Sequence, residues 1–228
     1  MTSASSEPRL IAAGRLEEFV AEAFQAVGVP AGDAGTVAQL MTRIDLRGLD
    51  GHGVFRLPQY IQRIKAGGIN VEPNIRIARE TESTALIDGD NAVGHLAVQE
   101  AVRVAMVKAE KSGVAWVGTN NSNHAGAASI YAMMPLERDM IGLYVAVGSA
   151  NHLPPWGGIE MLLSTNPLAC AIPGLEEPPI VLDMATTVAS YGKVKMAAQR
   201  GEQMPEGWMI DAEGNSLTDP TRADEGFL

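Results

Sequence analysis

Three residues of one segment, His52, Arg56 and Tyr60, have types and a spacing that could support acid–base chemistry on a small acid. Residues four apart share one face of a helix, so these side chains could line one wall of a site. A histidine transfers protons near neutral pH, and a guanidinium pairs with a carboxylate. Together with a phenol, they suit a 2-hydroxy or 2-keto acid. The same spacing is typical of a solvated polar helix face, and spacing alone leaves that alternative open.

A second candidate, His124, lies in an asparagine-rich segment, residues 120–128. The segment follows a predicted strand, residues 114–117, and opens a predicted helix. Loops at strand ends are where α/β sheets bind ligands, and a helix N-terminus favours anionic groups. The alternative is a simple capping turn, with Asn123 or Ser122 as the cap. The residues alone give the two interpretations equal support.

Asp183 is a third candidate, because it ends an apolar strand, residues 180–182, and precedes a predicted helix. Its carboxylate could accept hydrogen bonds from a ribose, orient a histidine or cap the helix, and capping is the commonest of these roles. The remaining histidines, His95 and His152, are expected to have a structural or surface role.

Several motifs that would indicate other chemistries are absent. Without G-x-G-x-x-G, nothing supports an ordinary Rossmann cofactor site. No Walker A, H-E-x-x-H or paired C-x-x-C motif occurs, and the histidines lack the spacing of metal ligands, so no metal site is expected. The absence of G-x-S-x-G weakens a hydrolase interpretation.

Charge and cysteine content limit the classes of partner. The 228 residues carry a formal net charge of −10, which disfavours nucleic acids and anionic membranes, because phosphate contacts need clustered Lys and Arg. The single cysteine, Cys170, lies in an apolar run, is expected to be buried, and indicates a reducing, cytoplasmic compartment. No run approaches the roughly 18 apolar residues of a membrane helix, and residues 1–8 lack a signal-peptide pattern.

The N-terminal part is predicted to be helical. Two amphipathic helices are expected over residues 14–47, the first with Phe19, Ala23 and Val27 on its buried face. A third helix is expected to include Pro58 in its first turn, where proline is tolerated.

The rest of the chain alternates between strands and helices. We expect a hairpin of strands 75–77 and 85–87, helix 93–110, strand 114–117, helix 127–136, strands 141–147, 168–172 and 180–182, and helix 188–200. This pattern predicts an α/β protein with a mixed sheet, flanking helices and an N-terminal helical segment. Residues 218–228 suggest neither a capped helix nor a strand.

Seven blocks of the chain carry a family resemblance, in order from about residue 10 to the end. The longest, residues 45–60, reads DLRGLDGHGVFRLPQY, and the others are residues 121–124, 155–158, 165–167, 182–187, 205–208 and 218–220. Together they resemble the malate/L-lactate dehydrogenase type-2 family, which includes ureidoglycolate, sulfolactate and diketogulonate enzymes and an imine reductase. The resemblance implies that family's own non-Rossmann nicotinamide-binding fold, with NAD or NADP as cofactor, a small carboxylate substrate and a homodimer.

The resemblance also implies roles for individual residues. His124 matches the catalytic histidine, which takes the proton of the substrate hydroxyl as hydride leaves for the nicotinamide. His52, Arg56 and Tyr60 match the substrate side, with Arg56 on the substrate carboxylate. The residues that match cofactor contacts are Ser149, Asp183, Met184 and Ala185. In imine-reducing members, the residue that matches Asp183 works with the one that matches His52.

Two departures from the family pattern stand out. The family usually has Ser-His-Gly where this chain has Gly51-His52-Gly53. The family also continues with a Lys-Gly-containing cofactor segment, so this chain is expected to lack the C-terminal third. Residues 1–72 would then form the helical substrate side and residues 73–228 a nicotinamide-binding domain that is incomplete at its C-terminus. The alternative to an active dehydrogenase is a truncated, non-catalytic remnant that only binds or dimerises.

Overall fold

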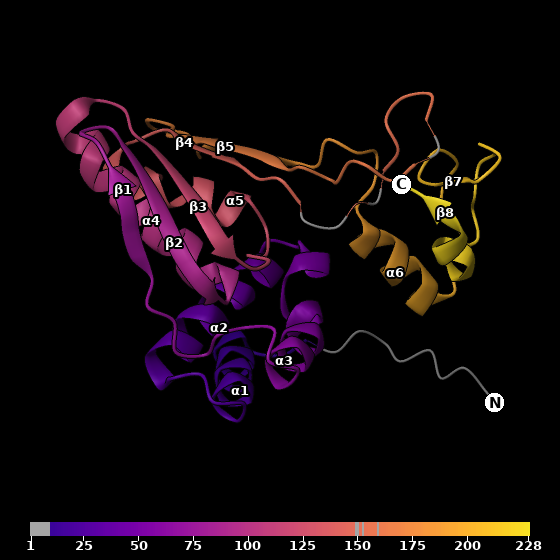
Figure 1. The fold of residues 1–228 in the computed structure, drawn as a ribbon, viewed down its shortest axis with the longest axis horizontal. Coiled ribbons are helices and arrows are strands. Elements are labelled where there is room, and N and C mark those ends of the chain that lie inside the picture. Colours follow the sequence, from indigo (N-terminus) through magenta and orange to yellow (C-terminus); the bar gives the residue numbers. More distant parts are fainter. Residues whose placement is uncertain (1–9, 149–150, 152, 159) are drawn as a thin grey trace. The chain divides into compact units, whose positions relative to one another are not determined.

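The computed structural model describes residues 10–148, 151, 153–158 and 160–228 of the chain (Figure 1). The chain divides into two compact units, one up to Gly126 and one from Ala127 to Leu228. The expected division after residue 72, between a substrate side and a cofactor side, concerns function and stays a prediction.

The first unit begins with helices α1 (Ala13–Gln25) and α2 (Ala31–Leu46), as expected. The predicted buried face of α1 is wrong for Phe19, which is 58% exposed, whereas Ala23 and Val27 pack partly buried against the core. The fully buried residues of α1 are Val20 and Phe24. Two apolar stripes with the same spacing run side by side on this helix, and periodicity could not tell which of them faces the core. The core here joins α1 and α2 to the third helix through residues that include Val37, Met41, Leu57, Tyr60 and Ile64.

Two short 3-10 turns, η1 (Asp50–His52) and η2 (Val54–Arg56), lead from α2 into α3 (Leu57–Lys65). Pro58 lies in the first turn of α3, as predicted, where its missing N–H breaks no helical hydrogen bond. Figure 1 shows α1, α2 and α3 grouped beside one end of the strands of this unit.

Those strands form a mixed sheet in the order β1-β2-β3, with β1 (Arg76–Glu80), β2 (Thr84–Ala92) and β3 (Trp116–Ser122). The predicted hairpin is confirmed, because β1 and β2 are antiparallel, and β2 and β3 are parallel. Helix α4 (Gly94–Ser112) makes the crossover between the parallel strands and packs on them with Ala101 and Val104. The parallel pair brings the loop after β3 to the end of the sheet where α4 begins.

The second unit contains an antiparallel sheet of β4 (Gly142–Val145), β5 (Leu168–Ile172) and β6 (Ile180–Met184). The predicted helix over 127–136 is wrong, because only one turn, α5 (Ser129–Ala132), is α-helical and a 3-10 turn, η3 (Met134–Arg138), follows. Pro135 lies in the first turn of η3 and has no N–H with which to continue α5. Cys170, expected to be buried, is only half-buried on β5.

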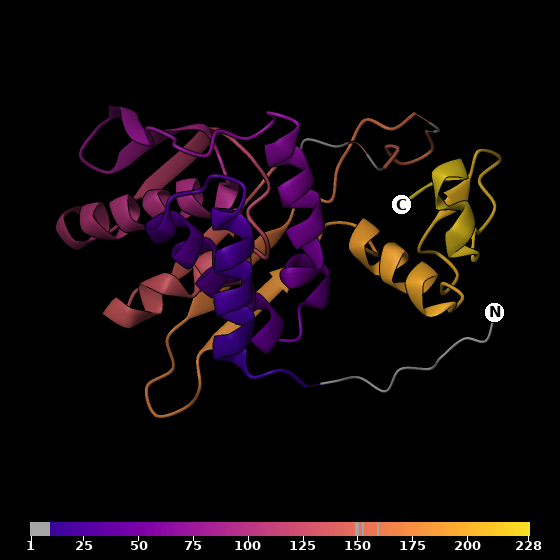
Figure 2. The ribbon, with the colours of Figure 1, turned by 90° about the horizontal axis from the view of Figure 1, so that it is seen from below.

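Residues 191–228 form a small subdomain of the second unit with its own apolar core. It comprises α6 (Tyr191–Arg200), β7 (Ile210–Asp211), the 3-10 helix η4 (Pro220–Glu225) and β8 (Gly226–Phe227). Figure 2 shows α6 beside η4. The side chain of Ser190 caps α6 by accepting the N–H of Lys193, so this helix begins later than predicted.

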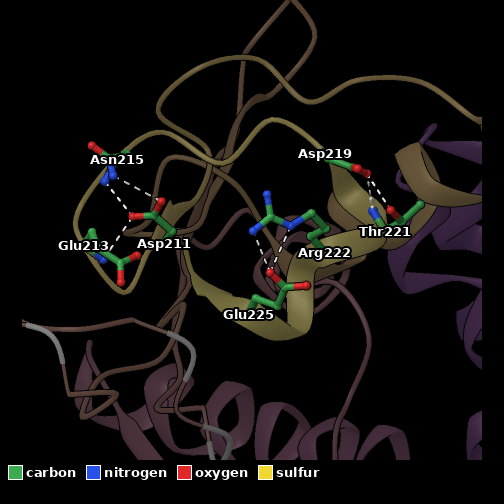
Figure 3. Close-up of polar contacts among 7 residues, drawn as sticks. All are labelled: Asp211, Glu213, Asn215, Asp219, Thr221, Arg222 and Glu225. Atoms are coloured by element: carbon green, nitrogen blue, oxygen red, sulfur yellow. Dashed lines mark hydrogen bonds and ion pairs between the residues drawn. The ribbon is translucent and has the colours of Figure 1, made fainter.

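The expectation that residues 218–228 hold neither a capped helix nor a strand is wrong. The Asp219 carboxylate accepts the N–H of Thr221 at 2.9 Å and caps η4, and Arg222 pairs with Glu225 (Figure 3). Strand β8 then pairs with β7. Local side-chain hydrogen bonds stabilise these elements, and elements this short carry no periodic apolar pattern.

Candidate active site

The segment that carries His52 is positioned by Asp45, near the end of α2. The Asp45 Oδ2 atom accepts the N–H of Val54 at 3.0 Å, directly after the turn that holds His52. A Cβ atom at Gly53 would overlap the Asp45 carboxylate and would displace it from the N–H of Val54. Burial raises the pKa of Asp45, which the hydrogen bond from Val54 partly offsets.

The loop that carries His124 is fixed to the end of β2 and the start of α4. The Asn123 side-chain amide donates to three oxygens, the side-chain and backbone oxygens of Asn91 and the Ala92 carbonyl, at 2.9–3.1 Å. A Cβ atom at Gly94 would overlap the backbone carbonyls of Asn123 and His124. Asn123 therefore holds the loop after β3 in place and does not cap a helix, which was one of the two alternatives for this segment.

These two segments bring Tyr60 and His124 together. The Tyr60 hydroxyl lies 2.6 Å from His124 Nδ1, and the backbone N–H of Gly126 donates to the same nitrogen at 3.3 Å. The His52 ring stacks on the His124 ring, with centroids 5.8 Å apart. The alternative of a solvated polar face is excluded for Tyr60, which is 3% exposed.

The electrostatic surroundings of His124 are positive. Burial is the main reason that the pKa of His124 falls to about 3, and Arg56, His52, His95 and Arg63 contribute to the same shift. Burial also raises the pKa of Tyr60 well above its usual range. At neutral pH the pair therefore consists of a neutral imidazole and a neutral phenol, in surroundings that favour an anionic ligand.

Arg56 presents a partly buried guanidinium beside this pair. Its Nε donates to the Gly51 carbonyl at 2.8 Å and its Nη1 to Gln59 Oε1 at 3.0 Å. Burial lowers its pKa, although it stays a cation at neutral pH. Within the described part of the chain, no acidic side chain forms an ion pair with Arg56, so its remaining N–H groups suit a ligand carboxylate.

His95 was expected to be structural or at the surface, and the structure places it in the core. It is fully buried, and its ring is perpendicular to that of Tyr60 with centroids 5.6 Å apart. Sequence reasoning missed this residue and Asp45 as neighbours of the site. Gly94, the tightly packed glycine that precedes His95, was the available signal. His152 lies outside the described residues, as does Ser149.

Asp183 lies on β6 in the second unit, where its carboxylate accepts the backbone N–H of Ser129 at 2.8 Å. It therefore caps α5, and not the helix that follows it in sequence. Met184 and Ala185 come next, and Met184 is 45% exposed. The expected cooperation of Asp183 with His52 stays a prediction.

The loops beside Met184 are held to one another by internal hydrogen bonds. Strands β4 and β6 both run antiparallel to β5, so the residues that follow each of them lie at the same end of the sheet. There the backbone N–H of Gly148 donates to Asn166 Oδ1 at 3.0 Å, and the Thr186 N–H and hydroxyl both donate to the Thr165 carbonyl. No cluster of side chains suited to a metal occurs among the described residues.

Solved structures with the same fold include dehydrogenases of 2-hydroxy acids. The sulfolactate dehydrogenase of Methanocaldococcus jannaschii superposes with a TM-score of 0.86 at 36% identity, over 96% of this chain and 63% of that chain. The malate dehydrogenase of Entamoeba histolytica gives a TM-score of 0.91 at 31% identity, over 96% of this chain and 61% of that chain. The expected mixed α/β fold, distinct from a Rossmann fold, is thereby confirmed.

Residues 11–228 match the model of the family described as malate/L-lactate dehydrogenase, and the chain belongs to this family. A malate dehydrogenase of Pyrococcus horikoshii is 43% identical over 204 residues, which cover 90% of this chain and 56% of the relative. The ureidoglycolate dehydrogenase (NAD(+)) of Escherichia coli is 35% identical over 205 residues, 90% of this chain and 58% of the relative. The chain thus spans somewhat more than half the length of these relatives.

Proposed function

We propose that this protein transfers a hydride between NAD or NADP and a small 2-hydroxy acid, with the 2-keto acid as the other reactant. This proposal rests on the buried Tyr60–His124 pair beside Arg56. It combines a proton-transfer group with a carboxylate-binding group in surroundings that favour an anion.

In this proposal Arg56 binds the substrate carboxylate and His124 exchanges the proton of the hydroxyl at C2. Nδ1 of His124 contacts Tyr60 and Gly126, which leaves Nε2 for the substrate. When bound, the nicotinamide supplies the acceptor for the hydride that leaves C2. His124 then holds the hydroxyl proton at Nε2 and returns it in the reverse direction.

The direction of the Tyr60–His124 hydrogen bond depends on the ring tautomer. When Nδ1 carries the ring proton, it donates to the Tyr60 oxygen, the N–H of Gly126 loses its acceptor, and Nε2 is free to act as a base. When Nε2 carries the proton, Nδ1 accepts from Tyr60 and Gly126, and Nε2–H can donate to the oxygen of a bound keto acid. The pair therefore suits both the hydroxy acid and the keto acid.

On the cofactor side, we assign Asp183, Met184 and Ala185 to the nicotinamide cofactor, together with Ser149. The half-exposed Met184 side chain, beside loops that internal hydrogen bonds hold in place, supports this assignment. Relatives are named for both cofactors, NAD(+) in Escherichia coli and NADP(+) in Chromohalobacter salexigens. Asp183 would also assist His52, as in the imine-reducing members.

We further propose a cytoplasmic homodimer, with residues 1–72 as the substrate side and 73–228 as the cofactor side.

The positive surroundings of His124 favour substrates with a second anionic group. Relatives are named malate and sulfolactate dehydrogenases, and both of those acids carry two negative charges. We therefore expect oxaloacetate and sulfopyruvate to be reduced with a lower KM than pyruvate, since each added charge would meet Arg56 or Arg63.

The test is the oxidation of NADH or NADPH by oxaloacetate, sulfopyruvate and pyruvate, followed by absorbance on the purified 228-residue chain. A fluorescence titration with each nucleotide runs in parallel. Turnover of a keto acid would support the proposal. A folded chain that binds neither nucleotide and turns over no acid would contradict it and favour the non-catalytic remnant.

A further inference from the structure

His95 is a buried polar residue that the proposed chemistry does not use. It is fully buried, and neither of its ring nitrogens has a hydrogen-bond partner among the residues that the structure describes. It is the second residue of α4, where burial and the positive end of the helix both favour the neutral ring. Burial lowers its pKa to about 3. An apolar side chain would fill this space without leaving two nitrogens unpaired, so packing alone does not explain a histidine here.

The His95 ring contacts one of the two groups that hold His124. It meets the Tyr60 ring at an interplanar angle of 90°, an edge-to-face arrangement that aromatic pairs prefer. The hydroxyl of the same tyrosine contacts His124 Nδ1. A change in the ring at position 95 would therefore move or loosen Tyr60, and through it His124.

The second group that holds His124 also approaches His95. A Cβ atom at Gly126 would come within 2.9 Å of His95 Nε2, and Gly126 has a φ of +77°, which favours glycine. The N–H of this glycine donates to His124 Nδ1. His95 therefore lies against both neighbours of Nδ1.

We propose that His95 is a positioning residue that, through Tyr60 and Gly126, fixes the orientation of the His124 ring. An effect of His95 on catalysis rests on the proposed function. Its effect on the orientation of the His124 ring does not, and can be measured without turnover. His95 itself touches neither substrate nor cofactor.

The test is a pH titration of the histidine rings by NMR on the full chain, labelled with nitrogen-15 at histidine. We compare the wild type with His95→Leu, which removes the ring, and with His95→Phe, which keeps a ring against Tyr60. In the wild type, His124 is expected to stay neutral with Nδ1 as an acceptor. In His95→Leu, the His124 nitrogen shifts should average between tautomers, and its pKa should rise by about one unit or more. His95→Phe should restore the wild-type behaviour at least in part.

The matched control is Val104→Ala. It removes buried volume from the same helix, at a position where α4 packs on the sheet. It should lower the melting temperature and leave the His124 titration unchanged. If turnover is found, His95→Leu should lower kcat about tenfold with little change in KM, as expected for a misplaced proton-transfer group.

A folded His95→Leu protein with unchanged His124 shifts and titration would overturn the proposal. If His95→Leu does not fold, His95→Phe is the test. A folded Phe variant with wild-type His124 signals would support the proposal, and one with altered His124 signals would contradict it. Neither NMR readout needs turnover. An inactive wild type would therefore contradict the proposed function and leave this inference to be decided separately.

Discussion

The Tyr60 hydroxyl lies 2.6 Å from Nδ1 of His124, although 64 residues separate them in the sequence. One comes from α3, which follows the turn at His52, and the other from the loop after β3. The mixed sheet and α4 bring the two segments together, and the hydrogen bond occupies one nitrogen of the imidazole. This relationship leads to several of the predictions below.

Tyr60→Phe should lower kcat about 10- to 100-fold and leave the KM of the keto acid nearly unchanged. The substitution removes one hydroxyl and keeps the ring in the core, so only the partner of His124 is lost. Steady-state kinetics of NADH oxidation would check this. An unaltered kcat would mean that the hydroxyl has no part in the proton transfer.

Arg56→Gln should raise the KM of the keto acid about 100-fold, because a charge-assisted contact with the carboxylate is lost. Arg56→Lys should recover only part of the loss, since an ammonium cannot form the paired contact. Arg79→Gln, on the exposed strand β1, is the matched control and should change nothing. Equal effects at positions 56 and 79 would refute the assignment of the carboxylate to Arg56.

Stability should fall as the pH drops below about 6.5. His95 and His124 each have a folded pKa of about 3, below the unfolded value of 6.5. Between these values only the unfolded chain binds the protons. The free energy of unfolding is therefore highest above pH 6.5 and decreases by about 1.4 kcal/mol per pH unit for each such histidine.

Urea denaturation at several pH values would measure this slope. His95→Phe and His124→Gln should each remove the contribution of one proton from the slope of the free energy of unfolding against pH. A slope that is the same in both variants and the wild type would show that these histidines are not held neutral.

Gly53→Ala should destabilise the protein by about 1–3 kcal/mol, because its Cβ would overlap the Asp45 carboxylate that holds the turn after His52. The control is Gly14→Ala in α1, where the new Cβ has open space and the helix gains about 0.5–1 kcal/mol. Chemical denaturation of both variants would test this. A Gly53→Ala protein as stable as Gly14→Ala would rule out the tight contact.

Local patterns were sufficient to predict most helices, the β1–β2 hairpin and the mixed sheet, because periodicity and proline position report on the backbone directly. They failed at α1, where two parallel apolar stripes compete, and at residues 218–228, where side-chain caps stabilise very short elements. The candidates Tyr60 and His124 were identified from their types and motifs. Their contact could not be predicted, because it depends on a parallel crossover between distant segments. For His95 the sequence left a structural and a surface role open, because its burial follows from the packing of α4 against the loop after β3.

The measurement that tests the central claim most directly is the rate of NADH oxidation by oxaloacetate in the wild type and in His124→Gln. The variant keeps a polar side chain of similar length and loses the group that exchanges a proton. We expect kcat to fall by about 100-fold or more, while NADH binding by fluorescence and the melting temperature stay close to those of the wild type. A folded His124→Gln protein with wild-type turnover would show that His124 is not the proton-transfer group.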